Sequence, residues 1–323
     1  MPIRVAVVGA GYLGQHHARV YADLQDAELV GVVDTNEDKA RAIAKKFGTK
    51  AFRSHKEVLD AAEALSIVVP TVSHYGIALD CLRAGKDVLV EKPITATLDE
   101  ADELIQEADR KGAVLQVGHL ERYNQGVIAL SGMVDAPRFI EAVRVSPFLN
   151  RAVDVDVTLD LMIHDIDIIL GLVRSPIKTI CASGFSLVTE KIDDARAWLG
   201  FENGAAAVLT ASRIARQKQR SLKVFQQNVC LELDYQTAEV RRCERVSDSR
   251  RGPAQSDESL AGLAVETVRP EQKEPLMSEL QDFLRCVVTR ERPKVSGVEG
   301  RNALKTVLDI NSFMRRTADD THG

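Results

Sequence analysis

Short apolar runs alternate with amphipathic stretches in the first part of the chain. Each apolar run has the length of a strand buried on both faces of a parallel sheet, and several of the amphipathic stretches end at a glycine. This alternation predicts an α/β fold with a doubly wound parallel sheet, in which Val114–Val117 is the last strand. The expected strands before it are Ile3–Val8, Glu28–Val33, Leu65–Val69 and Val88–Val90, and the expected helices are Gln15–Leu24, Glu37–Phe47, Lys56–Ala62, His74–Ala84 and Asp99–Lys111.

After Gly118 the pattern changes, and strands follow one another with few helices between them. Consecutive strands predict an antiparallel sheet, with two-residue turns at Asn203-Gly204 and Gln227-Asn228. We therefore expect an N-terminal domain over 1–120 and a second domain over 121–323. Its expected strands are Pro137–Pro147, Ile177–Val188, Ala195–Phe201, Ala205–Ile214, Ser221–Phe225 and Val229–Tyr235, followed by a surface excursion at Ser247–Glu274 and two helices at Leu276–Thr289 and Gly300–Arg316.

Composition narrows the class of protein. The chain has 323 residues, of which 45% are hydrophobic and 28% charged, so it has room for two cores. A net charge of -5 gives no reason to expect nucleic acid or an anionic membrane as a partner. Met1–Arg4 leads directly into a strand, so we expect no signal peptide, and no apolar run has the length of a membrane span. The 5 cysteines contain no C-x-x-C pair, which indicates reduced thiols in the cytoplasm and neither a disulfide frame nor a zinc site.

A glycine motif, Gly9-Ala10-Gly11-Tyr12-Leu13-Gly14, directly follows the first expected strand. The first glycine allows a tight turn, the second lets the backbone approach a pyrophosphate, and the third lets helix and strand pack closely. The next helix supplies N–H groups and a positive dipole to the phosphates. Asp34 ends the second strand, close to the expected interval of about 20 residues, where a carboxylate binds ribose hydroxyls and repels a 2′-phosphate. The motif predicts a dinucleotide site that prefers NAD to NADP.

The strand Val88–Val90 ends in Glu91-Lys92-Pro93. Pro93 keeps Lys92 extended, at the carboxyl end of a strand, where open α/β sheets bind ligands. By itself this segment is also compatible with a strand cap and a solvated lysine. Three residues at the same edge, Pro70, Thr71 and His74, either line the nicotinamide ribose or only begin a helix. The residues expected to bind the cofactor are Gly9, Gly11, Tyr12, Leu13, Gly14, Asp34, Pro70, Thr71, His74, Glu91, Lys92 and Gln116.

In the segment Asp154–Leu170, Asp160 and His164 are four residues apart, so on a helix they share one face. A carboxylate beside an imidazole fixes its tautomer and raises its basicity. Two other interpretations compete: a first-turn carboxylate with a core histidine, or a metal site that includes Asp167. The frames typical of metal sites, such as H-E-x-x-H, are absent from the sequence, so we predict no metal.

Together, the glycine motif, Asp34, Glu91-Lys92-Pro93, and Asp160 with His164 resemble the glucose-fructose oxidoreductase/inositol dehydrogenase/MocA family over nearly the whole chain. The resemblance implies a Rossmann domain followed by an α/β domain, whose open antiparallel sheet serves in forming a homodimer or homotetramer. It also implies oxidation or reduction of a sugar or cyclitol hydroxyl with a nicotinamide cofactor.

Two segments, Gly118–Asn124 and Leu161–Asp167, resemble family members that act at C3 of UDP-N-acetylglucosamine or its uronate. Relatives usually carry proline where Gln125 stands here. The resemblance implies the catalytic group Lys92, Asp160 and His164, and a substrate site formed by Lys92, Arg122, Tyr123, Asn124, Asp160 and His164.

Alcohol oxidation moves a hydride to the nicotinamide and a proton to a base. The resemblance makes His164 the base, Asp160 its stabiliser and Lys92 a hydrogen-bond donor, while Lys92 as the base stays a second possibility. The same fold also serves as a cofactor-binding regulator or as a glycosidase that uses bound NAD. The presence of both Lys92 and His164 favours an enzyme over a regulator.

Overall fold

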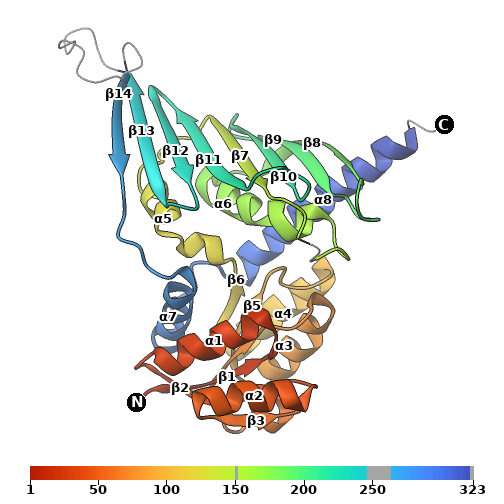
Figure 1. Ribbon diagram of the computed structural model, residues 1–323, viewed down its shortest axis with the longest axis vertical. Coiled ribbons are helices and arrows are strands. Elements are labelled where there is room, and N and C mark those ends of the chain that lie inside the picture. The colour runs from red at the N-terminus through yellow and green to blue at the C-terminus, as the bar shows by residue number, and fades with distance from the viewer. Residues whose placement is uncertain (150–151, 246–262, 321–323) are drawn as a thin grey trace. The chain divides into compact units, whose positions relative to one another are not determined.

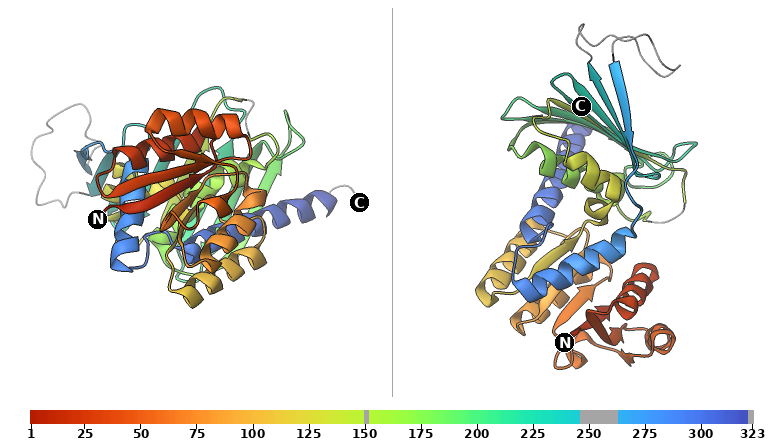
Figure 2. Two further views of the ribbon diagram at one scale, coloured as in Figure 1. Left: turned by 90° about the horizontal axis from the view of Figure 1, so that it is seen from below. Right: turned by 90° about the vertical axis from the view of Figure 1, so that its left-hand side faces the viewer.

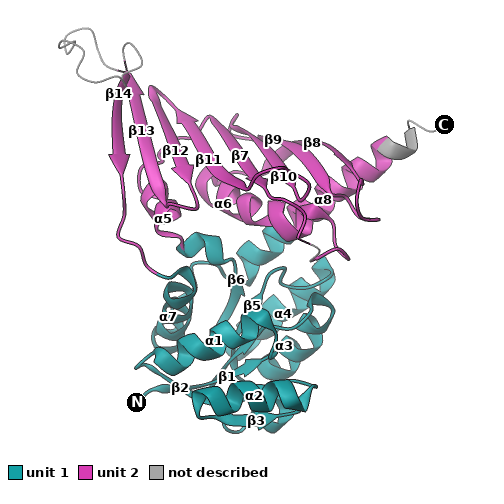
Figure 3. Cartoon of the chain, in the orientation of Figure 1, with its two compact units in different colours: residues 1–123, 274–304 teal, residues 124–273, 305–323 magenta. Residues whose placement is uncertain are grey.

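The computed structural model describes residues 1–149, 152–245 and 263–320. The chain forms two compact units (Figure 3). The first comprises residues 1–123 and 274–304, and the second comprises residues 124–273 and 305–323. No helix in the described part of the chain is long and apolar enough to cross a membrane.

The first unit contains a 6-stranded sheet in the order β3-β2-β1-β4-β5-β6 (Figure 1), and its strand pairs are parallel. The strand order reverses between β1 and β4, so the carboxyl ends of these two strands flank the crevice where such sheets bind nucleotides. The expected doubly wound sheet is confirmed. Its strands are β1 (Ile3–Val8), β2 (Ala27–Val33), β3 (Lys50–Phe52), β4 (Ala64–Ile67), β5 (Asp87–Glu91) and β6 (Leu115–Gly118).

The helices of this unit form two groups. One group, α1 (Tyr12–Asp23), α2 (Glu37–Phe47) and α7 (Pro275–Thr289), is joined through α1, which contacts both of the others. The other consists of α3 (His74–Arg83) and α4 (Leu98–Lys111), which pack together. Because the crossovers run in opposite directions from the central strands, right-handed connections place the β1–α1 and β4–α3 helices on opposite faces of the sheet.

The second unit contains an 8-stranded sheet in the order β14-β13-β12-β11-β7-β10-β9-β8. Among the described strand pairs of this second sheet, only β7–β10 is parallel, which confirms that the sheet is mainly antiparallel. Asn228 and Gly204 adopt positive φ angles of 62° and 85° in the two predicted hairpin turns. The strands are β7 (Phe139–Val145), β8 (Ile177–Phe185), β9 (Asp194–Phe201), β10 (Ala206–Ser212), β11 (Gln219–Gln226), β12 (Val229–Asp234), β13 (Glu239–Arg245) and β14 (Leu263–Val268).

Helices cover one face of this second sheet (Figure 2). They are α5 (Gln125–Ser131), α6 (Ile163–Val173) and the part of α8 (Gly297–Asp320) that belongs to this unit. Asn124 caps α5, since its side chain accepts a hydrogen bond from the backbone N–H of Gly126. Gln125 is then the first helical residue, a position that also favours proline, so glutamine in place of the usual proline still starts a helix here.

Three details differ from the expected elements. Lys56–Ala62 is not an α-helix: a capping box of Ser54 and Glu57 starts a single 3₁₀ turn at His55–Glu57, and only turns follow it up to residue 61. The strands β3 and β13 and the helix α5 were not assigned from the sequence. The expected surface excursion at Ser247–Glu274 is wrong for Leu263–Val268, which forms the edge strand β14 on β13. Residues 246–262 lie outside the described part of the chain.

The unit boundaries place the C-terminal region differently from the expected division at residue 120. The first break, after Tyr123, lies close to the expected one, but residues 274–304 belong to the first unit. The reason is the apolar face of α7, where Leu280, Phe283 and Leu284 join the core around β1 and α1. The sequence pattern of α7 alone does not show that its apolar face packs against β1 and α1.

Candidate active site

The glycine loop has the geometry of a dinucleotide turn. Gly9 has φ +111°, and a Cβ there would lie 2.1 Å from the carbonyl oxygen of Val68. A Cβ on Gly14 would lie 1.8 Å from the carbonyl oxygen of Gly9, so helix α1 and the loop touch there. Gly11 has no such neighbour within 4 Å and leaves its backbone open to a ligand. All three roles expected of these glycines fit the observed backbone.

The N-terminus of α1 suits a phosphate. Its N-cap, Gly11, makes no side-chain capping hydrogen bond, and the first turn carries no acidic residue. Its first N–H groups are therefore not claimed by a side-chain cap, and the helix dipole adds positive potential. Tyr12 and Leu13 are exposed at this turn. A pocket of about 430 Å³ adjoins the loop and is lined by Ala10, Gly11, Tyr12, Gln15, Lys39, Ala42 and Ile43.

Asp34 is fixed at the end of β2 by two backbone donors. Its Oδ2 accepts a hydrogen bond from the N–H of Ala10 at 2.8 Å, and its Oδ1 accepts one from Asn36 at 2.8 Å. Each carboxylate oxygen accepts more than one hydrogen bond, so capacity remains for ribose hydroxyls. The residues present thus fit NAD: an open glycine, an uncapped helix start and an oriented carboxylate.

The end of β5 is held by a buried histidine. Nε2 of His17, on α1, lies 3.2 Å from Oε1 of Glu91, and Oε2 of Glu91 accepts a hydrogen bond from the backbone N–H of Lys92 at 3.2 Å. The Glu91 carboxyl group also lies against Gly118, where a Cβ would come within 3.0 Å of both of its oxygens. Burial acts to raise the pKa of Glu91, but the hydrogen bond and charge of His17 and the charge of Lys92 outweigh it and lower the pKa.

His74 anchors the next part of this strand end. Its Nδ1 lies 2.9 Å from the carbonyl oxygen of Pro93, and its Nε2 lies 2.9 Å from the carbonyl oxygen of Val69. The ring is buried, so it ties the end of β4 to the residue after Lys92. Pro70 and Thr71 begin a 3₁₀ turn beside it. Contact of these residues with the cofactor stays a prediction.

Gln116 and Tyr123 belong to a buried polar cluster of the first unit. The side-chain amide of Gln116 donates to the Tyr123 hydroxyl at 3.3 Å and to the backbone carbonyl of Glu279 at 3.2 Å. The Tyr123 hydroxyl donates to Asp282 at 2.8 Å. Burial, followed by the charge of Asp282, raises the pKa of Tyr123, so its phenol is neutral. Both predicted site residues therefore have a role in packing α7 against β6, and their contact with ligands stays a prediction.

Asp160 and His164 lie where a π-helical turn, Thr158–Met162, runs into α6. Such turns are frequent at functional sites. Along residues 157–169 the side chains are buried except those of Leu159, Asp160 and His164, which are half-buried. Four residues are close to one turn of either helix type, so Asp160 and His164 emerge on the same side, as expected. The π-turn itself was not predicted.

A buried ion pair holds α6 in place next to His164. The guanidinium of Arg144, on β7, donates to both oxygens of Asp165, at 2.8 Å and 2.9 Å. The Tyr235 hydroxyl donates to the same carboxylate at 3.0 Å, and the Tyr235 backbone carbonyl accepts from the side-chain amide of Asn124 at 3.2 Å. Asn124, predicted to contact substrate, therefore has its amide engaged in this network. Arg122 is half-buried, and its backbone carbonyl accepts from the Lys294 ammonium.

Sequence reasoning missed His17, Glu279 and the Arg144–Asp165 pair. A signal existed for His17, because it lies three residues after Gly14 and four before Tyr21, on the buried stripe of α1. A histidine on such a stripe requires a polar partner inside the core. No local signal pairs Arg144 with Asp165, since the two meet only when β7 packs on α6.

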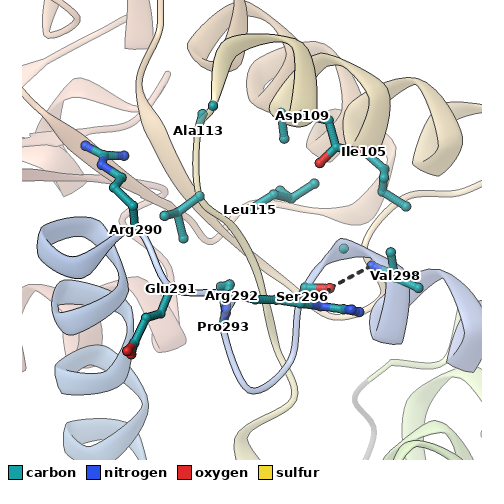
Figure 4. Close-up of a pocket in the computed structure, with 14 residues that line it drawn as sticks. Ile105, Asp109, Ala113, Leu115, Arg290, Glu291, Arg292, Pro293, Ser296 and Val298 are labelled. Atoms are coloured by element: carbon teal, nitrogen blue, oxygen red, sulfur yellow. Dashed lines mark hydrogen bonds between the residues drawn. The ribbon is translucent and has the colours of Figure 1, made fainter.

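A pocket of about 470 Å³ elsewhere in the first unit does not belong to this site (Figure 4). It lies at the amino end of β6, where Ala113 and Leu115 line it, whereas the glycine loop follows the carboxyl end of β1. Its two arginines are engaged within the protein, Arg290 by Asp87 and Arg292 by Glu299. The chemistry at the strand ends identifies the site better than the size of this hollow.

The fold and the glycine loop define an NAD-binding oxidoreductase, and the comparisons with known proteins agree. Residues 3–119 match the oxidoreductase family with an NAD-binding Rossmann fold, and residues 131–231 match the GFO/IDH/MocA C-terminal domain. The chain belongs to the GFO/IDH/MocA oxidoreductase family.

Its relatives include dehydrogenases named for a nucleotide sugar and for a cyclitol. The chain is 34% identical to UDP-N-acetylglucosamine 3-dehydrogenase of Acidithiobacillus ferrooxidans over 319 residues, which cover 97% of this chain and 99% of that protein. A crystal structure of that enzyme matches with a TM-score of 0.91 over 97% of both chains. Myo-inositol 2-dehydrogenase of Thermotoga maritima is 26% identical, over 94% of this chain and 93% of that protein.

Proposed function

We propose that this protein is an NAD-dependent dehydrogenase that oxidises the C3 hydroxyl of a UDP-N-acetylhexosamine. The observation that carries the proposal is the 34% identity to UDP-N-acetylglucosamine 3-dehydrogenase, which extends over 97% of this chain and 99% of that enzyme. Relatives that act on inositols are less similar, as with the 26% identity of the Thermotoga maritima enzyme. The segments Gly118–Asn124 and Leu161–Asp167 support the same assignment by resemblance.

The proposed chemistry removes two electrons and two hydrogens from a secondary alcohol. NAD, which the glycine loop and Asp34 would hold, would supply the hydride acceptor for converting the alcohol into a ketone. In our proposal His164 takes the hydroxyl proton, Asp160 stabilises the imidazolium, and Lys92 donates a hydrogen bond to the oxygen. The half-buried positions of Asp160 and His164 among buried neighbours support these roles.

Recognition of the substrate requires a group that binds a diphosphate. We assign this role to Arg122, because a guanidinium binds phosphate oxygens bidentately and lysine does not. Tyr123 and Asn124 have buried structural roles beside it, which leaves Arg122 as the best candidate for direct contact in this segment. An ion pair of Arg122 with Glu121 or another acid is the alternative explanation for its presence.

The protein is also proposed to form a homodimer or homotetramer through the second sheet. The more exposed face of this sheet carries an aromatic group of Phe139, Trp198 and Phe225. The ring centroids of Phe139 and Trp198 are 5.7 Å apart, and those of Phe139 and Phe225 are 6.0 Å apart. Trp198 is 44% exposed and Phe225 37%. A contiguous apolar patch of this kind favours contact with another protein surface. The free thiols of all 5 cysteines are the state expected in the cytoplasm, where we place the protein.

The test compares three reductants of NAD with the purified protein: UDP-N-acetylglucosamine, free N-acetylglucosamine and myo-inositol. We expect NADH formation with the UDP-sugar, and a sharp loss of substrate affinity in Arg122→Ala. Activity on myo-inositol alone would refute the nucleotide-sugar assignment and support an inositol dehydrogenase. Tight NAD binding with no turnover of any sugar would support a regulator.

A further inference from the structure

Glu91 links a buried histidine to the proposed catalytic lysine. His17 is fully buried, the Glu91 side chain is 13% exposed, and the hydrogen bond between them joins α1 to the end of β5. The second oxygen of Glu91 accepts from the backbone N–H of Lys92. Gly118 leaves the room that the carboxyl group fills. Three contacts therefore fix where this carboxyl group lies.

The charge of Glu91 acts on Lys92. Burial acts to raise the pKa of Glu91, and the charge of the Lys92 ammonium, after the hydrogen bond and charge of His17, is one of the causes that lower it. Coulomb attraction is mutual, so the Glu91 carboxylate favours the protonated form of Lys92 by the same interaction. Because the Glu91 carboxylate is largely buried, solvent screens its attraction to the Lys92 ammonium only weakly.

The other ionisable groups around Glu91 do not supply an unpaired negative charge that could take its place. Glu279, on α7, is fully buried, and neither of its carboxyl oxygens has a hydrogen-bond partner among the described residues. Burial, followed by the charges of Glu91 and Asp282, raises the pKa of Glu279 well above its usual range, so this group is neutral. Burial also raises the pKa of Tyr21, which stays a neutral phenol bonded to Ser66. Asp282 pairs with Arg285.

We propose that Glu91, held in place by His17, is a positioning residue that keeps Lys92 protonated during turnover. Lys92 then acts as the hydrogen-bond donor to the reacting oxygen, and the proton of the substrate hydroxyl goes to His164. This inference rests on the proposed function and decides between the two bases that the sequence left open. Glu91 does so without touching the reacting atoms.

The test is the pH dependence of kcat/KM in Glu91→Gln, with UDP-N-acetylglucosamine and NAD as substrates. Glutamine keeps the size of the side chain and an oxygen that accepts from His17, but removes the charge. We expect the alkaline limb of the profile to move to lower pH by about one unit, because Lys92 loses its proton sooner. If Lys92 were the base, the acid limb would move to lower pH instead. That result, or a loss of activity with neither limb displaced, would overturn the proposal.

Two variants serve as controls. Glu91→Asp keeps the charge, so its alkaline limb is expected to stay near that of the wild type even where kcat falls. Glu279→Gln replaces a neutral buried group by another neutral group, so neither limb should move. A shift in Glu279→Gln as large as that in Glu91→Gln would show that the effect is not specific to Glu91, and would contradict the proposal.

A second readout does not depend on the sugar. Carbon-13 NMR of reductively methylated lysines titrates Lys92 directly, with its signal identified by its loss in Lys92→Arg. We expect this signal to titrate at lower pH in Glu91→Gln than in the wild type. Identical titrations would overturn the inference, even in an active enzyme. Absence of UDP-sugar oxidation by the wild type, with a displaced Lys92 titration, would refute the proposed function alone.

Discussion

Three glycines show how single residues shape the nucleotide side of the protein. Gly9 and Gly14 approach backbone atoms so closely that no Cβ fits, and Gly118 makes room for the carboxyl group of Glu91. The first two belong to a motif that can be recognised in the sequence. The third is the last residue of an ordinary buried strand, and its role depends on a side chain from the neighbouring strand. Motif glycines can therefore be interpreted from sequence, whereas Gly118 requires the register of β5 and β6.

Cofactor preference depends on Asp34. Its carboxylate is aimed by Ala10 and Asn36, and it repels a 2′-phosphate. We expect Asp34→Ala combined with Thr35→Arg to shift preference toward NADP, with Lys39 in the adjoining pocket supplying a further cation. Fluorescence titration with both cofactors measures the change. A wild type that binds NADP at least as tightly as NAD would contradict the assignment of Asp34.

Removal of a catalytic side chain separates binding from chemistry. We expect Lys92→Ala and His164→Ala to bind NAD as the wild type does and to lose turnover by about 100-fold to 10,000-fold, the usual cost of one acid or base group. Asp160→Asn should lose less, because the imidazole remains. Single-turnover kinetics and cofactor titration measure the two effects. Near wild-type turnover in either alanine variant would remove that residue from the catalytic group.

The buried Glu279 makes stability depend on pH. Its pKa is raised in the folded protein, mainly by burial, so the folded state keeps a proton that the unfolded state loses above its ordinary pKa. Wild-type stability should therefore decline as pH rises from about 4.3 toward the raised folded value, by at most about 1.4 kcal/mol per pH unit for one proton. Glu279→Gln lacks this loss, so its stability relative to wild type should increase from pH 5 to pH 8. Urea unfolding curves that run parallel over that range would contradict a neutral Glu279.

At the scale of elements, hydrophobic periodicity predicted most helices and the two hairpins, because those patterns are local. It did not predict β3, β13, β14, α5 or the π-turn at Thr158–Met162. Edge strands such as β14 are stabilised by pairing with a neighbour more than by their own sequence. A π-turn needs one extra residue in a helix whose composition is otherwise ordinary. The residues of the proposed site were selected because they lie at strand ends and on one helix face.

The Arg144–Asp165 pair joins β7 to α6 and thereby positions the turn that carries His164. Both side chains are only 2% exposed, so removing one leaves a buried charge without its partner. We expect Arg144→Met or Asp165→Asn to cost about 3–5 kcal/mol of unfolding free energy. Chemical denaturation measures this cost. The double variant Arg144→Met/Asp165→Leu should recover part of it, and recovery of none would argue against an ion-pair origin.

At the scale of the whole molecule, the fold class and family follow from motifs spread along the chain. The assignment of residues 274–304 to the first unit does not follow from them. Leu280 and Phe283 form an amphipathic stripe that is compatible with either core. Tertiary packing decides whether α7 packs against the core of the first unit or that of the second. The local sequence pattern does not contain this information. The class of function can be predicted from the sequence more readily than this packing, because the residues proposed to perform chemistry are few and occupy characteristic positions.

The second sheet is expected to form the interface of the proposed homodimer or homotetramer. Phe225 and Phe139 are opposite each other on β11 and β7, and Trp198 on β9 extends the aromatic row across the sheet. A charge placed among these rings would be desolvated in an interface but solvated in a monomer. We therefore expect Trp198→Glu to shift a dimer or tetramer toward monomer with little change in fold. Light scattering at micromolar concentration measures the mass, and Lys178→Glu on the exposed part of β8 provides a charge-changing control. A monomeric wild type, or an unchanged assembly in Trp198→Glu, would show that this face is not the interface.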